Sequence, residues 1–153
     1  MAKSLNQFGG WLKFFYITQW IVIILCVVFT LQVVLLIFGA ENTNEMIEFL
    51  FASLKSLITL ILFIKIIKRI KKRDVSIPNQ IVKLMTWVVM FTVIFAICEG
   101  FMYYLTLGRE GLSNLTKMGE DLFRILIWYA IWASYFKKSQ RVFSYYGKNA
   151  GKT

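Results

Sequence analysis

The sequence contains no histidine, one proline and only two cysteines among its 153 residues. Without histidine, the chain lacks the commonest protein ligand for metals and the commonest general base. It also lacks a Cys-x-x-Cys pair, a nucleophile elbow, a glycine-rich phosphate loop and a carboxylate cluster. The two thiols, Cys26 and Cys98, fall in apolar stretches and are interpreted as small apolar side chains. The sequence therefore predicts no metal, no cofactor and no enzymatic activity.

Acidic residues are also few, because the chain has 8 Asp and Glu against 18 Lys and Arg, a net charge of +10. Apolar residues make up 58% of the sequence, aromatic residues 17%, and the mean hydropathy is +0.63. This composition is too apolar for an ordinary soluble domain. It indicates a protein whose surroundings are largely the lipid bilayer.

Four apolar stretches are long enough to cross a membrane as helices, a task that needs about 20 residues each. They lie near residues 15–38, 46–70, 80–106 and 120–136. A backbone in lipid must satisfy its own hydrogen bonds, which favours helices. The prediction is an all-α polytopic membrane protein, a single four-transmembrane-helix bundle over residues 1–153.

Local signals mark the helix ends. Asn44 is expected to cap the second helix, and Pro78 to stand in the first turn of the third. The fourth helix is expected to run from the acids at 120–121 to the lysines at 137–138, an order that the helix dipole favours.

The stretch from Lys65 to Arg73 packs six cations into nine positions. With the amino terminus inside, 13 Lys and Arg residues fall on the inner side, whereas the outer loops hold only Arg109 and Lys117. This asymmetry is typical of the positive-inside rule. It predicts both termini, a basic loop at 65–79 and a tail at 137–153 in the cytoplasm, in the cell inner membrane.

Four of these cations, Lys65, Lys68, Arg69 and Lys72, recur at helical spacing where the second helix leaves the membrane. Their long side chains could reach anionic headgroups of the inner leaflet. A nucleic-acid surface is the alternative for such a run. A topology anchor with lipid contact is favoured, because most multispan proteins carry such loops, and no nucleic-acid partner is predicted.

Among the ionisable residues within the predicted spans, Lys55, Glu99 and Arg124 suggest a functional hypothesis. Charges in hydrocarbon are costly and are expected to face the bundle interior, a partner or water. One interpretation is a path for a proton or small ion, with Glu99 as the carboxylate and Lys55 as its modulator. The favoured interpretation is a Glu99–Arg124 latch between helices, with Lys55 reaching the interface or pairing with Glu48.

The fourth apolar stretch carries Trp128, Trp132 and Phe136 on one helical face. This stripe could receive a partner helix or a flat ring, or it could pack against the other three helices. Aromatic packing is the default interpretation.

The amino-terminal segment has an amphipathic character. Leu5, Phe8, Trp11 and Leu12 fit a short helix along the inner interface, interrupted at Gly9-Gly10. The glycines would permit a turn and a close approach to another part of the chain.

Two short motifs resemble a known family. The first motif is Gly9-Gly10-Trp11-Leu12, just before the first span. The second is Ser139-Gln140-Arg141-Val142, which follows the aromatic end of the last span. Together they resemble the bacterial family of small membrane proteins known as domain of unknown function 2569, with Gln140 where that family has Lys. The resemblance implies a four-helix inner-membrane protein and assigns no activity.

These two motifs also lead to a structural hypothesis. Gly9, Gly10 and Trp11 are expected to touch the segment that contains Ser139 and Arg141, and so to close the inner mouth of the bundle.

Two classes of function remain. The first is an accessory, assembly or scaffold subunit that acts through helix–helix and lipid contacts, with a membrane-protein partner or a second copy of itself. The second is a small oligomeric transporter or channel for a proton or small ion, built around Lys55 and Glu99. The accessory function is preferred, because four spans fill their own core with side chains.

Overall fold

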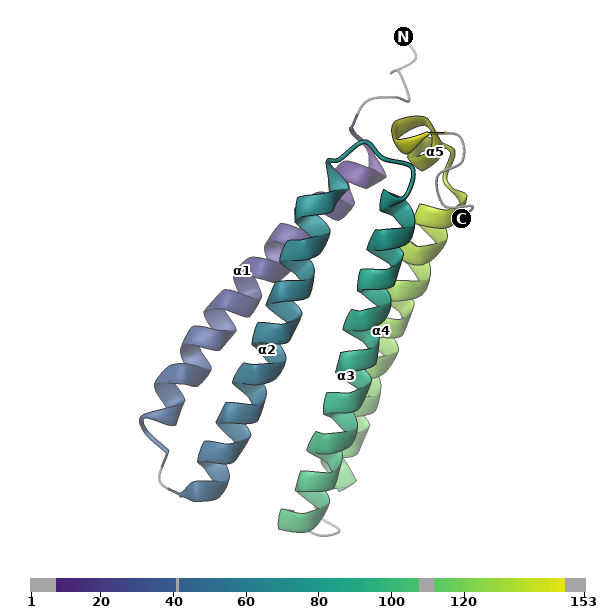
Figure 1. The fold of residues 1–153 in the computed structure, drawn as a ribbon. Coiled ribbons are helices and arrows are strands. Elements are labelled where there is room, and N and C mark those ends of the chain that lie inside the picture. The colour runs from purple at the N-terminus through teal and green to yellow at the C-terminus, as the bar shows by residue number, and fades with distance from the viewer. Residues whose placement is uncertain (1–7, 41, 108–111, 148–153) are drawn as a thin grey trace.

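The computed structural model describes residues 8–40, 42–107 and 112–147, and these residues form five α-helices and no β-strand (Figure 1). The predicted all-α class is therefore confirmed. The helices are α1 (Trp11–Ile37), α2 (Thr43–Ile70), α3 (Ile77–Leu107), α4 (Leu112–Lys138) and α5 (Gln140–Tyr146). The amino-terminal helix predicted around Leu5 lies mainly outside the described residues, and Trp11 and Leu12 belong to α1.

In the described part of the chain, three helices are long and apolar enough to cross a membrane: Trp11–Ile37, Glu45–Ile70 and Ile77–Met102. These helices support the prediction of a membrane protein. α4 does not join them, because its first half contains Lys117, Glu120, Asp121 and Arg124. The predicted fourth span is therefore not confirmed.

The start of α2 differs from the prediction. Its N-cap is Asn42 and not Asn44, since the Asn42 Oδ1 accepts a hydrogen bond of 2.9 Å from the Glu45 N–H. A capping side chain reaches the amide three residues later, and the helix begins directly after Asn42.

The start of α3 agrees with the prediction. It begins at Ile77, and Pro78 lies in the first turn, where a missing N–H costs nothing. Just before it, the hydroxyl and the N–H of Ser76 both donate to the Asp74 Oδ1, at 2.6 and 2.7 Å. These hydrogen bonds lower the pKa of the Asp74 carboxyl.

α4 begins at Leu112, well before the predicted start at Glu120. The acids at 120–121 therefore lie inside the helix and not in its first turn. Its last turn does contain Lys137 and Lys138, as predicted.

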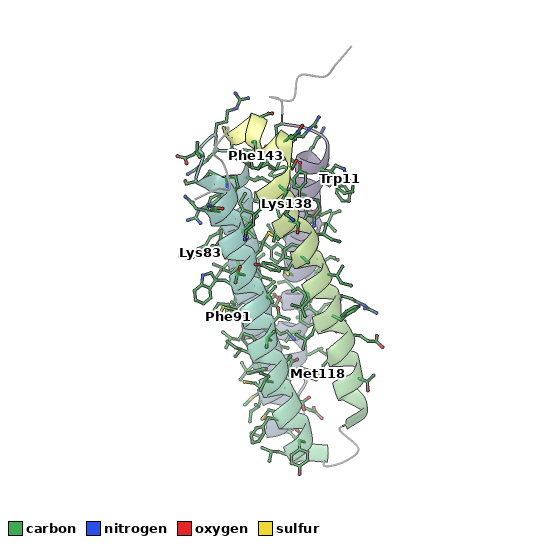
Figure 2. All side chains as sticks on the ribbon, turned by 90° about the vertical axis from the view of Figure 1, so that its right-hand side faces the viewer. Trp11, Lys83, Phe91, Met118, Lys138 and Phe143 are labelled. Carbon is green, nitrogen blue, oxygen red and sulfur yellow. The ribbon has the colours of Figure 1, made fainter. Side chains whose placement is uncertain are left out.

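The four long helices form two antiparallel pairs, α1 with α2 and α3 with α4, joined by packing of α2 against α3 (Figure 1). The pairs converge where α5 and the connection at 71–76 lie, and they diverge towards the other end. We call the first the basic end, after Lys71, Lys72 and Arg73, and the second the acidic end, where Glu45 and Glu120 lie. Figure 2 shows Trp11, Lys138 and Phe143 near the basic end and Met118 near the other.

The main hydrophobic core occupies the half of the bundle next to the basic end. Phe15, Ile66, Ile81, Met85 and Phe136 are fully buried there and belong to one cluster. In the acidic half, Val33, Phe95 and Ala96 are buried but lie outside this cluster. Packing is thus concentrated where the two pairs meet.

Candidate functional site

The central feature of the acidic half is an ion pair between α2 and α3. The Lys55 Nζ lies 2.8 Å from the Glu99 Oε1 and 3.0 Å from its Oε2. Helical side chains lean towards the amino terminus of their own helix. Because α2 and α3 are antiparallel, Lys55 leans towards the acidic end and Glu99 leans towards the basic end, so the two side chains meet.

This pairing corrects the expectation that Glu99 would bind Arg124. Arg124 instead contacts acids of its own helix, with Nη2 3.5 Å from the Glu120 Oε2 and Nη1 3.5 Å from the Asp121 Oδ1. Acids three and four residues away lie on the same helix face and are the nearest available partners. The expectation that Lys55 would bind Glu48 is likewise wrong.

The Lys55–Glu99 pair is only partly covered, with 35% of the lysine side chain and 24% of the glutamate side chain exposed. Beside it lies a groove of about 720 Å³ between α1, α2 and α3. Its walls are the following residues: Phe29, Val33 and Leu36 from α1; Ile47, Glu48, Phe49, Phe51 and Ala52 from α2; Ile97, Cys98, Glu99, Phe101 and Met102 from α3. Among the described residues, none from α4 lines it.

The groove is apolar except for two carboxylates. Glu48 is exposed and makes no ion pair within the described part of the chain, whereas Glu99 holds Lys55. Glu48 and Lys55 are two helical turns apart on the same face of α2. The groove and its rim therefore combine two negative charges with one positive charge.

The basic end is closed by α5. The Tyr146 hydroxyl donates to the Ile70 carbonyl, and the Tyr145 hydroxyl donates to the Lys71 carbonyl at 3.2 Å. Both acceptors belong to the end of α2, where carbonyls have no partner within the helix. Burial, helped by the neighbouring Tyr145, raises the pKa of the Tyr146 phenol.

The predicted contact between the two motifs is confirmed at Gly10. This residue has a φ of 57°, and a Cβ at this position would clash with the Arg141 guanidinium. The Arg141 side chain therefore occupies the space that a larger residue at position 10 would need. Gly9 precedes it, half-buried, and Ser139 serves as the N-cap residue of α5.

The aromatic stripe of α4 is part of the protein's own core. Phe136 is fully buried and Trp132 is 6% exposed, while Trp128 is half-buried. The Phe15 ring of α1 lies 4.6 Å from Trp132 and 5.0 Å from Phe136, centroid to centroid. The default interpretation as packing is confirmed, and the stripe is not free to receive a partner helix.

The six cations of the basic run fall into two groups. Lys65, Lys68 and Lys72 are exposed and Arg69 is half-buried. The other two contact aromatic rings of this chain, Lys71 at 4.5 Å from the centre of Tyr16 and Arg73 at 5.1 Å from that of Tyr145. The two cations that contact rings are not among the four that were predicted to contact lipid headgroups.

Sequence reasoning missed the polar contact between α1 and α2. The Thr30 and Ser56 hydroxyls lie 2.8 Å apart, and Ser56 also donates to the Cys26 carbonyl at 3.2 Å. Cys26 takes part through its backbone carbonyl, so its side chain gave no signal of this contact. Gln19 is fully buried on α1, and its Oε1 has no hydrogen-bond partner among the described residues. Lys83, an exposed cation of α3 (Figure 2), also escaped notice.

Comparison of the chain with protein-family models, with curated proteins and with solved structures gives no match. The resemblance to domain of unknown function 2569 stays a prediction.

Proposed function

We propose that the chain is an integral protein of the cell inner membrane, with four spans and both termini in the cytoplasm, that serves as an accessory or assembly subunit. It has no catalytic activity of its own. It acts by binding another membrane protein or a second copy of itself, and by contacting anionic lipid of the inner leaflet through Lys65, Lys68, Arg69 and Lys72.

The main support for this proposal is the packed aromatic cluster of Phe15, Trp132 and Phe136 at the basic end, which we call the aromatic seal. Phe15 and Phe136 are fully buried and Trp132 nearly so, and α5 covers the end of α2 beside them. The interior is filled by side chains at this level, as expected for a bundle of this size. A single copy with a filled interior is better suited to binding than to conducting.

Three observations support the membrane topology. α1, α2 and α3 have the length and hydropathy of spans, and α4 packs beside α3, with the Tyr129 and Thr86 hydroxyls 3.1 Å apart. The ends of α2 and α4 that carry cations lie together at the basic end. Cations flanking spans favour the cytoplasmic side.

The outer face of α1 is the surface we assign to a protein partner. Only 11% of the most apolar window of α1 is buried, against 39% for α3. Ile24, Leu25 and Leu31 are exposed on α1, and none of them lines the groove.

Site-specific photo-crosslinking in intact membranes tests this assignment. A benzoylphenylalanine at Ile24, Leu25 or Leu31 is expected to give one protein adduct of constant mass, identified by mass spectrometry. The matched probes are Ile94 and Ile97, which are also exposed and apolar but belong to α3. Adducts from α1 and α3 alike, or no protein adduct from α1, would contradict the proposal.

A second candidate function, conduction of a proton or small ion, is favoured by the partial exposure of the Lys55–Glu99 pair at the groove. It requires the basic end to open. The test is a flux assay in liposomes with Lys55→Leu and Glu99→Gln. Loss of flux with normal expression supports conduction, and unchanged flux removes it.

A further inference from the structure

We propose that the groove at the acidic end is a binding site for a monovalent amphipathic cation, an apolar molecule that carries one ammonium or phosphonium charge. This site does not depend on the accessory function, because it uses the groove and not the outer face of α1. Three properties of the groove lead to it: size, aromatic lining and charge.

The size suits a small organic molecule. A volume of about 720 Å³ lies within the range typical of pockets for drug-sized ligands, which is roughly 300–1,000 Å³. Val33, 4% exposed, lies among its walls, and most other lining side chains are apolar. A groove of this character favours an apolar body over a hydrated ion.

The aromatic lining comes from all three helices, with Phe29 from α1, Phe51 from α2 and Phe101 from α3. Aromatic faces attract cations, and the attraction grows when the site is dry. Phe51 is held in place by Phe95, with ring centroids 4.9 Å apart. The lining therefore places three aromatic rings beside a diffuse positive charge.

The charge selects the sign of the ligand. Glu48 and Glu99 line the groove, Lys55 neutralises Glu99, and α1 contributes no ionised side chain to its walls. One negative charge is left over, on the exposed Glu48. Acids also outnumber cations among the described residues of the acidic end, which attracts cations to its mouth.

Lys55 has a definite role in this site, as a competitor of the ligand. Its ammonium occupies both oxygens of Glu99, and a bound cation would lie near the same carboxylate. Removing the ammonium should leave two carboxylates for one ligand. The structure thus predicts that loss of the Glu48 charge weakens binding of the cation and that loss of the Lys55 charge strengthens it.

The test is equilibrium binding of radiolabelled tetraphenylphosphonium to the full chain in nanodiscs of phosphatidylcholine, a lipid without net charge. Saturable binding to one site per chain is expected. Glu48→Gln should weaken it about tenfold, the effect of one lost charge contact. Lys55→Met should strengthen it, provided that circular dichroism and size exclusion show a folded chain.

Two controls separate this site from nonspecific effects. Tetraphenylborate has the same shape and the opposite charge, and it should bind at least tenfold more weakly. Glu120→Gln removes an exposed acid of α4 outside the groove and should leave binding unchanged.

Four results would overturn the proposal. They are no binding above that of empty nanodiscs, equal binding of tetraphenylborate, equal losses in Glu120→Gln and Glu48→Gln, and weaker binding in folded Lys55→Met. Equal binding of tetraphenylborate would mean that the groove takes any apolar molecule, including a lipid chain.

Discussion

The same four long helices reach both ends of the bundle, but different contacts hold them together at each end. At the basic end, α1 and α4 pack aromatic rings together, and α5 donates hydrogen bonds to the last carbonyls of α2. At the acidic end the helix pairs diverge, and one ion pair beside an apolar groove joins α2 to α3. The basic end is held mainly by packed rings, whereas the acidic end combines the ion pair with a smaller ring contact between Phe51 and Phe95.

This difference matters because apolar burial contributes little between helices that are already in lipid. Close packing and hydrogen bonds then determine which contacts hold the helices. The basic end has both, so we infer that it is the rigid part of the molecule. The acidic end has space, and it is the part where a ligand or a change in packing can be accommodated.

The largest expected effect comes from two substitutions on the same helix. Phe15→Ala removes a fully buried ring of the seal and should lower the free energy of unfolding by about 3 kcal/mol. Phe29→Ala, on the half-exposed wall of the groove, should cost about 1 kcal/mol or less. Unfolding in a denaturing detergent, followed by tryptophan fluorescence, measures both. Equal costs would mean that the two ends are packed alike.

The ion pair should show the next largest effect. Lys55→Leu or Glu99→Leu alone leaves a charge without its partner and should cost about 2 kcal/mol. The double substitution should recover much of that loss, because no lone charge remains. A double-mutant cycle gives the coupling free energy. Additive losses would show that Lys55 and Glu99 do not hold α2 to α3.

The contribution of the basic end to the stability of the protein should decrease at alkaline pH. The pKa of the Tyr146 phenol is raised in the folded protein, whereas an unfolded tyrosine titrates near 10. Below about pH 10 both states keep the proton and the stability is complete. Above it the unfolded chain loses the proton more readily, so the stability falls.

The measurement is the free energy of unfolding at several alkaline pH values, for the parent and for Tyr146→Phe. The substitution should cost about 1 kcal/mol at neutral pH, since it removes the hydrogen bond to the Ile70 carbonyl. It should also flatten the alkaline decline. If both proteins lose stability with the same slope, Tyr146 is not the group responsible.

The smallest effect is expected at Arg124. Its contacts with Glu120 and Asp121 are 3.5 Å long, and 72% of its side chain is exposed. Arg124→Gln should change the stability by less than about 0.5 kcal/mol. A loss comparable to that of Lys55→Leu would restore Arg124 as a structural latch.

Periodicity and punctuation in the sequence were enough to predict the four long helices and the Pro78 start of α3. Two short motifs beside the first and last spans were enough to predict that their segments touch, as they do at Gly10 and Arg141. The partner of Glu99 was not predictable. Depth along the helices placed Glu99 and Arg124 level with each other, but depth does not tell which faces are turned together. The lean of Lys55 and Glu99 along antiparallel helices decides the pairing, and it becomes visible only once α2 and α3 are placed side by side.

The groove was also beyond the sequence, since it arises from the divergence of two helix pairs and not from any local pattern. Phe29, Phe51 and Phe101 read as ordinary span residues until three helices bring them together. The aromatic stripe of α4 was predictable, because three aromatic residues on one helical face indicate packing whichever helices lie beside them.

The hydrogen bonds from the Tyr145 and Tyr146 hydroxyls to the Lys71 and Ile70 carbonyls affect the order in which the protein can be assembled. The ribosome synthesises α5 after the four long helices, so the carbonyls at the end of α2 wait without these partners until α5 emerges. Insertion of the first hairpin into the membrane therefore cannot complete the basic end. The basic end is complete only after a short helix has returned to the end of α2, which lies 74 residues earlier for one hydrogen bond and 76 for the other. A chain cut before Tyr145 would lack both hydrogen bonds and leave these two carbonyls at the end of α2 without their tyrosine partners.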